Sequence, residues 1–175
     1  VTVLSTSNGW SKVSYAGTTG YISADYLVTA SSGTAINPSN TAASVSISAK
    51  RQSVLNYAAQ FLGVPYVYGG STPSGFDCSG YTMYIYQQFG VYLPHGATDQ
   101  LSYGTAVGFG ELQPGDLVFF QDADFSSSAA SHCGIYIGDG QFIHATSDSR
   151  FNCVKITSFS ESYYASHFLT GRRLF

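Results

Sequence analysis

Hydrophobic and polar residues alternate over three short runs at the start of the chain, a pattern typical of β-strands. The runs are Val1–Ser5, Trp10–Tyr15 and Gly20–Leu27, and the turn-forming residues Asn8-Gly9 and Gly17 separate them. The pattern predicts a small antiparallel meander. A segment this short cannot bury enough apolar surface to be stable alone without a disulfide or a metal, and it contains no cysteine.

The pattern then changes twice. Residues 29–50 consist almost wholly of Ala, Ser, Thr, Asn, Gly and Pro, with Lys50 as the only charge, which indicates a flexible linker. Apolar residues return at three- and four-residue spacing over Arg51–Leu62 and predict a helix that ends at Gly63. We therefore expect three parts: a β segment at 1–28, a linker at 29–50 and a main domain at 51–175.

A second helical pattern begins at Cys78, after a Gly- and Pro-rich loop over residues 65–77. Aromatic and aliphatic residues then recur at helical spacing as far as Phe89, and Gly90 ends the pattern. Cys78 thus falls in the first turn of a helix, where unpaired amides and the helix dipole favour a thiolate. This position makes Cys78 the candidate nucleophile.

Two histidines follow in strand-like sequence and are candidates for the base. After a strand over Asp116–Phe120, His132 and His144 lie on the two arms of a predicted hairpin. A two-residue Asp139-Gly140 loop would place them on opposite faces. We predict instead the three-residue loop 138–140 with a left-handed Gly140, which sets His144 opposite Gly134 and diagonal to His132.

Composition narrows the class of protein. The 175 residues are 44% hydrophobic, enough for one principal domain. Only 10% are charged and the net charge is −3, which argues against nucleic acid or anionic lipid as a partner. No apolar run approaches the length of a membrane span. The abundance of Ser, Thr, Asn, Gly and Tyr indicates a secreted or surface protein.

The three cysteines permit at most one disulfide. If Cys78 is the nucleophile, Cys133 and Cys153 remain as a possible pair. Two buried thiols that behave as small hydrophobic residues are the alternative that we favour.

Three blocks of this sequence carry a family resemblance. In chain order they read "PYVYGGSTPSGFDCSG", "LQPGDLVFF" and "HCGIYIGDGQFIHA", and they resemble the signature blocks of the NlpC-type family of cell-wall cysteine peptidases over about 53–175. Residues 1–28 resemble the C-terminal half of a bacterial SH3-like module. The resemblance implies a papain-like α+β fold with helices packed on a central antiparallel sheet.

The resemblance also implies an activity. Members of this family cleave the bond between γ-D-glutamate and a diamino acid, diaminopimelate or lysine, in peptidoglycan stem peptides, and no metal or cofactor is implied. Cys78 matches the nucleophile, His132 the general base and His144 the third residue of the triad, which orients the base. Tyr66 matches a tyrosine whose hydroxyl could donate to the oxyanion together with the Cys78 amide.

Asp77 and Ser79 match positions that contact the polar end of the substrate. Asp77 is equally suited to cap the helix. We expect the two remaining histidines, His95 and His167, to be structural or solvent-exposed.

The chain departs from the family pattern in two places. Cys133 stands where small β-branched residues commonly follow the base, and we expect it to face the core and to matter little. The polar loop Gln121–Ser131, with Asp122 and Asp124, precedes His132 and is either ordinary surface or a rim of the site whose carboxylates favour a substrate amine.

Other functions stay open at this point. A related cysteine amidase or acyltransferase would use the same thiol and imidazole, and a non-catalytic wall-binding protein would need neither. Zinc binding by Cys78, His132 and His144 suits the residue types but lacks the usual ligand spacing. We expect a secreted or cell-wall-associated monomer that acts on peptidoglycan stem peptides.

Overall fold

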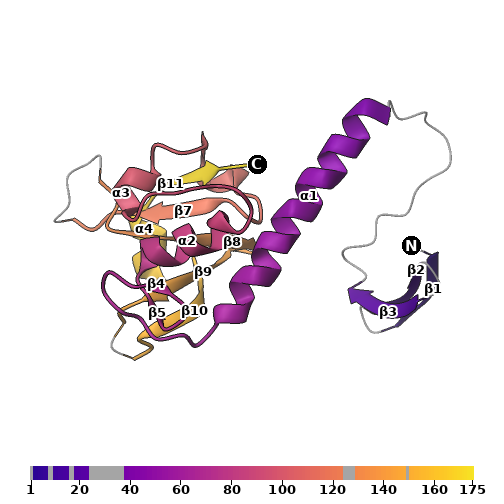
Figure 1. The fold of residues 1–175 in the computed structure, drawn as a ribbon, viewed down its shortest axis with the longest axis horizontal. Coiled ribbons are helices and arrows are strands. Elements are labelled where there is room, and N and C mark those ends of the chain that lie inside the picture. Colours follow the sequence, from indigo (N-terminus) through magenta and orange to yellow (C-terminus); the bar gives the residue numbers. More distant parts are fainter. Residues whose placement is uncertain (1, 8–9, 16–17, 24–37, 124–128, 149) are drawn as a thin grey trace. The chain divides into compact units, whose positions relative to one another are not determined.

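The structure, a computed structural model, describes residues 2–7, 10–15, 18–23, 38–123, 129–148 and 150–175. The chain divides into two compact units, Val1–Asn37 and Pro38–Phe175, which are considered separately (Figure 1).

The first unit contains the predicted meander. Strands β1 (Thr2–Ser7), β2 (Trp10–Tyr15) and β3 (Thr18–Ser23) form an antiparallel sheet in the order β1-β2-β3. The predicted turns and the predicted end of the third strand, residues 24–27, lie outside the described residues. The alternating pattern therefore identified all three strands.

The second unit opens with a helix that is longer than expected. Helix α1 spans Pro38–Ala58 and continues as a short 3-10 turn, η2 (Ala59–Phe61). Our prediction of a linker as far as residue 50 and of a helix from Arg51 was therefore wrong. Proline suits the first position of a helix, and neither glycine nor another proline interrupts residues 39–62. The first half of α1 extends beyond the sheet (Figure 1). Its sequence has no apolar stripe, so the spacing of apolar residues could not predict that this half is helical.

The centre of the second unit is one antiparallel sheet of six strands in the order β10-β9-β8-β7-β11-β6. These strands are β6 (Thr105–Val107), β7 (Leu117–Phe120), β8 (His132–Gly138), β9 (Gln141–Thr146), β10 (Cys153–Ser158) and β11 (Phe168–Arg173). The other elements are α2 (Cys78–Gln87), α3 (Ala97–Gln100), α4 (Ser162–His167), η3 (Phe109–Glu111) and the small pair β4 (Ser71–Thr72) and β5 (Gly75–Phe76). The α+β architecture with helices on a central antiparallel sheet is confirmed.

The two faces of the sheet have separate cores. Helices α1 and α2 cover one face, where Tyr81 and Ile85 pack with Phe119 and Ile135. The other face carries a smaller aromatic cluster in which Tyr164 of α4 packs with Val118, Phe120, Phe142 and Phe159. Because neighbouring strand residues alternate between the faces, strands β7, β8, β9 and β11 each contribute to both cores.

The β8–β9 hairpin has the register that we predicted, reached by a different turn. Ile135 lies opposite Ile143, and continuing this register places Gly134 opposite His144. The loop, however, is the two-residue Asp139-Gly140, both with positive φ, and a bulge between Tyr136 and Gly138 supplies the missing residue. The shape of the loop was predicted wrongly, but the consequence for the histidines was right.

Candidate active site

Cys78 is the first residue of α2, and Asp77 caps the helix. The Asp77 carboxylate accepts from the backbone N–H of Gly80 at 2.7 Å, which confirms the predicted cap. A side chain on Gly80 would place its Cβ 2.1 Å from the carbonyl oxygen of Gly70, so glycine is needed where the preceding loop crosses the helix. The Asp-Cys-Ser-Gly sequence thereby fixes the nucleophile at the helix N-terminus.

The environment of Cys78 favours its thiolate. The neighbouring side chain of Cys133, followed by that of His132, lowers the pKa of Cys78 well below its usual value against the opposing effect of burial. Cys78 therefore ionises more readily than an ordinary cysteine.

His132 and His144 form a relay that ends at Thr157. His132 Nε2 lies 2.6 Å from His144 Nδ1, and His144 Nε2 lies 2.9 Å from Thr157 Oγ1. Burial, followed by the charge of His132, holds the pKa of His144 well below its usual range, so His144 is neutral. When His132 is protonated, its Nε2–H donates a hydrogen bond to His144 Nδ1. The Nε2–H of His144 then donates to Thr157 Oγ1, which leaves the Nδ1–H of His132 for the sulfur of Cys78.

Small and aromatic residues hold the two imidazoles in place. The ring of His144 packs near those of Phe142 and Tyr164, with centroids 4.7 and 5.4 Å away. A Cβ on Gly134 would lie 3.1 Å from the His144 Cβ and 2.9 Å from the carbonyl oxygen of Ile143. Gly134 thus leaves the space that the sequence led us to expect beside the histidines.

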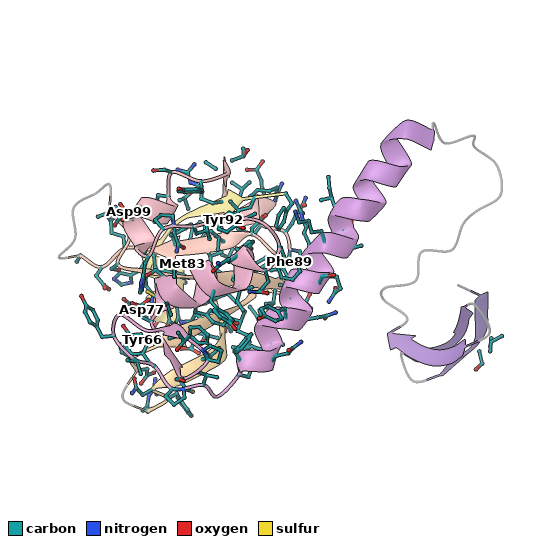
Figure 2. The ribbon with its side chains drawn as sticks, in the orientation of Figure 1. Tyr66, Asp77, Met83, Phe89, Tyr92 and Asp99 are labelled. Atoms are coloured by element: carbon teal, nitrogen blue, oxygen red, sulfur yellow. The ribbon has the colours of Figure 1, made fainter. Side chains whose placement is uncertain are left out.

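Tyr66 lies beside the nucleophile, as predicted. It lines the cavities on both sides of Cys78. Burial, assisted by the nearby Cys78, raises the pKa of Tyr66, so its hydroxyl keeps its proton and can serve as a donor. Figure 2 shows Tyr66 near Asp77, at the end of the unit where α2 begins.

The first cavity beside Cys78 contains Asp77, Ser79 and, unexpectedly, His95. The Asp77 carboxylate accepts from Ser79 Oγ at 3.1 Å and from the Gly69 amide at 3.0 Å, and it pairs with His95 Nε2 at 2.8 Å. His95 was expected to have no role at the site. It follows Leu-Pro in a segment without a clear helical or strand pattern, and only the folded chain brings it to Asp77.

The second cavity, of about 390 Å³, contains His132 as well as Cys78. Its charged lining residues are Asp122, Asp148, Arg150 and Glu161. The hydroxyl of Tyr163 donates to Asp122 and lowers the pKa of that carboxyl, while Arg150 binds Asp148 at 3.0 Å. The predicted rim therefore includes Asp122, whereas Asp124 lies outside the described residues.

The remaining histidine and cysteines have simpler surroundings. His167 is partly buried and stacks on Tyr163, with ring centroids 4.4 Å apart, as expected for a histidine with a structural place outside the site. All three cysteines are free thiols; Cys133 is fully buried and Cys153 is partly exposed. The possible disulfide between Cys133 and Cys153 is not formed, in line with the reading that we favoured.

In the described part of the chain, no group of three histidine, cysteine or acidic residues is arranged to hold a metal ion. His132 and His144 direct nitrogens at each other rather than at a common point. Among the described residues, none of the helices combines the length and the apolar character that a membrane span requires.

Comparison with known proteins identifies similar domains. Residues 63–173 match the model of the NlpC/P60 family, and residues 1–28 match that of the bacterial SH3 domain. The chain is 46% identical over 124 residues to the gamma-DL-glutamyl hydrolase of Bacillus subtilis, covering 70% of this chain and 29% of that protein. It is 37% identical over 120 residues to the gamma-D-glutamyl-L-lysine dipeptidyl-peptidase of Bacillus cereus, covering 69% and 35%.

A solved structure gives the same result. The NlpC/p60 domain of the peptidoglycan hydrolase SagA superposes with a TM-score of 0.62 at 32% identity, over 70% of this chain and 97% of that domain. This chain spans about a third of the length of the two curated relatives described above.

Proposed function

The chain belongs to the NlpC/P60 family, and we propose that it is a peptidoglycan hydrolase, specifically a cysteine endopeptidase. It cleaves the bond between γ-D-glutamate and diaminopimelate or lysine in stem peptides. The observation that carries this proposal is the Cys78 thiol at the head of α2, next to the His132–His144 relay. The names of the two Bacillus relatives, both of which refer to γ-glutamyl bonds, support the choice of substrate.

In the acylation step, the Cys78 thiolate attacks the γ-carbonyl carbon of D-glutamate. Cys78 is the first residue of α2, where the backbone N–H has no acceptor within the helix, so this amide and the Tyr66 hydroxyl can bind the oxyanion. The C–N bond then breaks, and imidazolium His132 gives its proton to the leaving amine. Water activated by His132 hydrolyses the thioester and regenerates the thiol.

The position of His132 sets the direction of the substrate. The leaving amine must lie beside the group that protonates it, and His132 lines only the cavity that contains Asp122. The diamino acid therefore occupies this second cavity. The acyl part of the stem peptide occupies the first cavity, where Asp77 and Ser79 contact its polar end.

The charges of the second cavity suit a diamino acid. Three carboxylates and one guanidinium line it, which leaves an excess of negative charge for the side-chain ammonium of lysine or diaminopimelate. Arg150 is already paired with Asp148. Asp122, which is held by Tyr163 in its ionised form, is the carboxylate most clearly available to a substrate amine.

The site of action follows from the substrate. An enzyme that cleaves stem peptides works outside the cytoplasmic membrane, so we propose a secreted or cell-wall-associated protein. Both halves of the site come from a single chain, which is consistent with a monomer.

The test is mass spectrometry of muropeptides digested by the parent and by the Cys78→Ala variant. We expect the parent alone to release L-Ala-γ-D-Glu fragments. Cleavage at another amide bond by the parent alone would indicate a related amidase. Equal wall binding without cleavage by either protein would indicate a binding protein and refute the proposal.

A further inference from the structure

Two walls of the first cavity beside Cys78 are joined by a buried amide that the proposed reaction does not use. One wall is the start of α2, with Cys78 and Ser79, and the other is the segment 95–98, which leads into α3. Gln100, the last residue of α3, does not line the cavity and is fully buried. Glutamine is seldom fully buried unless its polar atoms have partners, so the partners of Gln100 show what it holds together.

The side chain of Gln100 makes both of the hydrogen bonds that an amide nitrogen can donate. Its Nε2 donates to the carbonyl oxygen of Ser79 at 3.0 Å and to that of Pro94 at 2.8 Å. Its Oε1 accepts a hydrogen bond from Thr82 Oγ1 at 2.7 Å. Ser79 belongs to the first turn of α2, and Pro94 directly precedes the segment 95–98. One side chain thus binds the backbone of both walls.

A second contact joins the same two walls nearer the solvent. His95 Nε2 lies 2.8 Å from Asp77 Oδ2, and the two side chains are 32% and 12% exposed. A pair that water can reach contributes little, whereas a buried carbonyl oxygen that loses its donor carries the full cost of desolvation. The buried amide of Gln100 should therefore determine the spacing of the walls more than the pair at the surface does.

The segment 95–98 is also fixed to the part of the chain that leads to the base. Thr98 Oγ1 donates to the carbonyl oxygen of Ala130 at 3.2 Å and accepts from the Ala130 amide at 3.1 Å. Ala130 belongs to the third wall of the cavity and lies two residues before His132, where β8 begins. Loss of the Gln100 amide would leave this contact in place and would weaken only the attachment of the segment to α2.

We propose that Gln100 is a positioning residue for the acyl part of the substrate. By binding Ser79 and Pro94, it fixes the distance between α2 and the segment 95–98, and with it the width of the cavity that receives L-Ala-γ-D-Glu. This inference rests on the proposed function, which places the acyl part in that cavity. None of the three hydrogen bonds of the Gln100 amide involves the side chain of Cys78 or of His132, so Gln100 acts on binding of the substrate rather than on reactivity of the thiol.

The first experiment compares KM and kcat of the 175-residue parent, Gln100→Met and Thr82→Val on L-Ala-γ-D-Glu-L-Lys and on its diaminopimelate counterpart. Methionine matches the length of glutamine but donates no hydrogen bond. Gln100→Met should raise KM roughly three- to tenfold and leave kcat within about twofold, because it removes hydrogen bonds that shape the binding cavity. Thr82→Val keeps both N–H bonds of Gln100, so its KM should equal that of the parent even though it loses the third bond.

Alkylation of Cys78 by iodoacetamide separates binding from reactivity, since this small reagent does not need the cavity for the acyl part. Its rate, followed by peptide mass spectrometry, should agree within about twofold between the parent and Gln100→Met. A KM equal to that of the parent would refute the proposal. So would a fall in the alkylation rate as large as the rise in KM, because it would show that Gln100 acts on the nucleophile itself.

Hydrogen exchange tests the contact between the walls without a substrate. The amide of Gly96 donates to Pro94 and that of Gln100 donates to Gly96. Exchange over residues 94–100, measured by mass spectrometry, should be at least about tenfold faster in Gln100→Met than in the parent or in Thr82→Val. Unchanged exchange in Gln100→Met would refute the proposal.

Gln100→Asn is measured alongside, because its amide is one methylene too short to reach both carbonyl oxygens. It should raise KM and speed exchange in the same direction, and it decides the question if Gln100→Met does not fold. A parent that cleaves neither tripeptide would contradict the proposed function. The exchange measurement would even then decide whether Gln100 holds the two walls together.

Discussion

The two cavities on either side of Cys78 are built in different ways. The acyl side is lined by residues from 66–79, 95–98 and 130–131. Both oxygens of its central carboxylate, Asp77, accept hydrogen bonds from the protein or pair with His95. The leaving-group side is assembled from segments near 122, 132, 148 and 162 and keeps an excess of carboxylates. On the acyl side, the carboxylate of Asp77 is already bonded within the protein. On the leaving-group side, the excess negative charge is available to a ligand. Specificity should therefore respond to changes on the second side and stability to changes on the first.

Replacement of Cys78, where the two cavities meet, should have the largest effect. Cys78→Ala should lower kcat by at least about a thousandfold, because no other group can form the acyl-enzyme. Binding of an intact stem peptide, measured by calorimetry, should persist, since both cavities remain. Residual turnover near the rate of the parent would place the nucleophile elsewhere.

The histidine relay should affect rate rather than binding, since His144 and Thr157 line neither cavity. His144→Ala should lower kcat by roughly 100- to 1,000-fold, because His132 loses the group that orients it. Thr157→Val should cost about tenfold or less, because it removes only the partner that fixes the tautomer of His144. Steady-state kinetics checks both variants, and a rise in KM without a fall in kcat would contradict this role.

A matched pair of charge removals compares the two cavities directly. Asp122→Asn should lower kcat/KM about threefold to tenfold for stem peptides with lysine or diaminopimelate after the scissile bond, because an ion pair of this kind contributes about 1 kcal/mol. The same variant should leave a peptide with norleucine at that position unaffected. Asp77→Asn should show no such discrimination. An equal loss of kcat/KM on both peptides in Asp122→Asn would show that the charge of Asp122 does not bind the substrate amine.

Stability should depend more on the acyl side. Asp77→Ala should lower the free energy of unfolding by about 1–2 kcal/mol, because the amides at the start of α2 lose their cap. Asp77→Asn keeps a capping oxygen and should cost less. Urea denaturation measures the difference, and equal losses in the two variants would show that the charge of Asp77, rather than its cap, stabilises the helix.

The last prediction concerns pH and His144. The folded-state pKa of His144 is depressed, so the unfolded chain binds the proton more readily than the folded chain does. The stability contribution of His144 is therefore complete above its unfolded pKa, about 6.5, and is lost as the pH falls below it, by at most about 1.4 kcal/mol per pH unit. His144→Gln should flatten this slope in urea denaturation measured between about pH 4.5 and 7, and a slope identical to that of the parent would contradict the assignment.

Local sequence signals predicted the elements that short-range physics determines. The spacing of apolar residues predicted α2 and strands β1, β2, β3, β7, β8 and β9, and the Asp-Cys-Ser-Gly sequence predicted the cap that places Cys78 at the start of α2. Alternation within β8 and β9 placed both histidines on one face, even though the bulge that sets the register was not foreseen. The polar first half of α1 escaped detection because its sequence has no apolar residues at helical spacing.

The partners that act across the fold could not be predicted in the same way. Thr157 reaches His144 only through the pairing of β10 with β9, and His95 reaches Asp77 only when the loop after α2 folds back. Cys133 was expected to face the core, and it is fully buried there, but its contacts with Thr82 and Gln100 were not predicted. Each of these contacts depends on long-range register, which one sequence does not encode in its local pattern.

Strand β11 lies between β7 and β6 in the sheet, although it is the last strand in the chain. A ribosome makes β6 and β7 first, and the two cannot be joined in one sheet until residues 168–173 have emerged to pair with both. Arg173 then locks this arrangement through its two-pronged contact with Asp116, at 2.8 and 3.0 Å. Completion of the sheet is therefore timed to the end of synthesis of this domain.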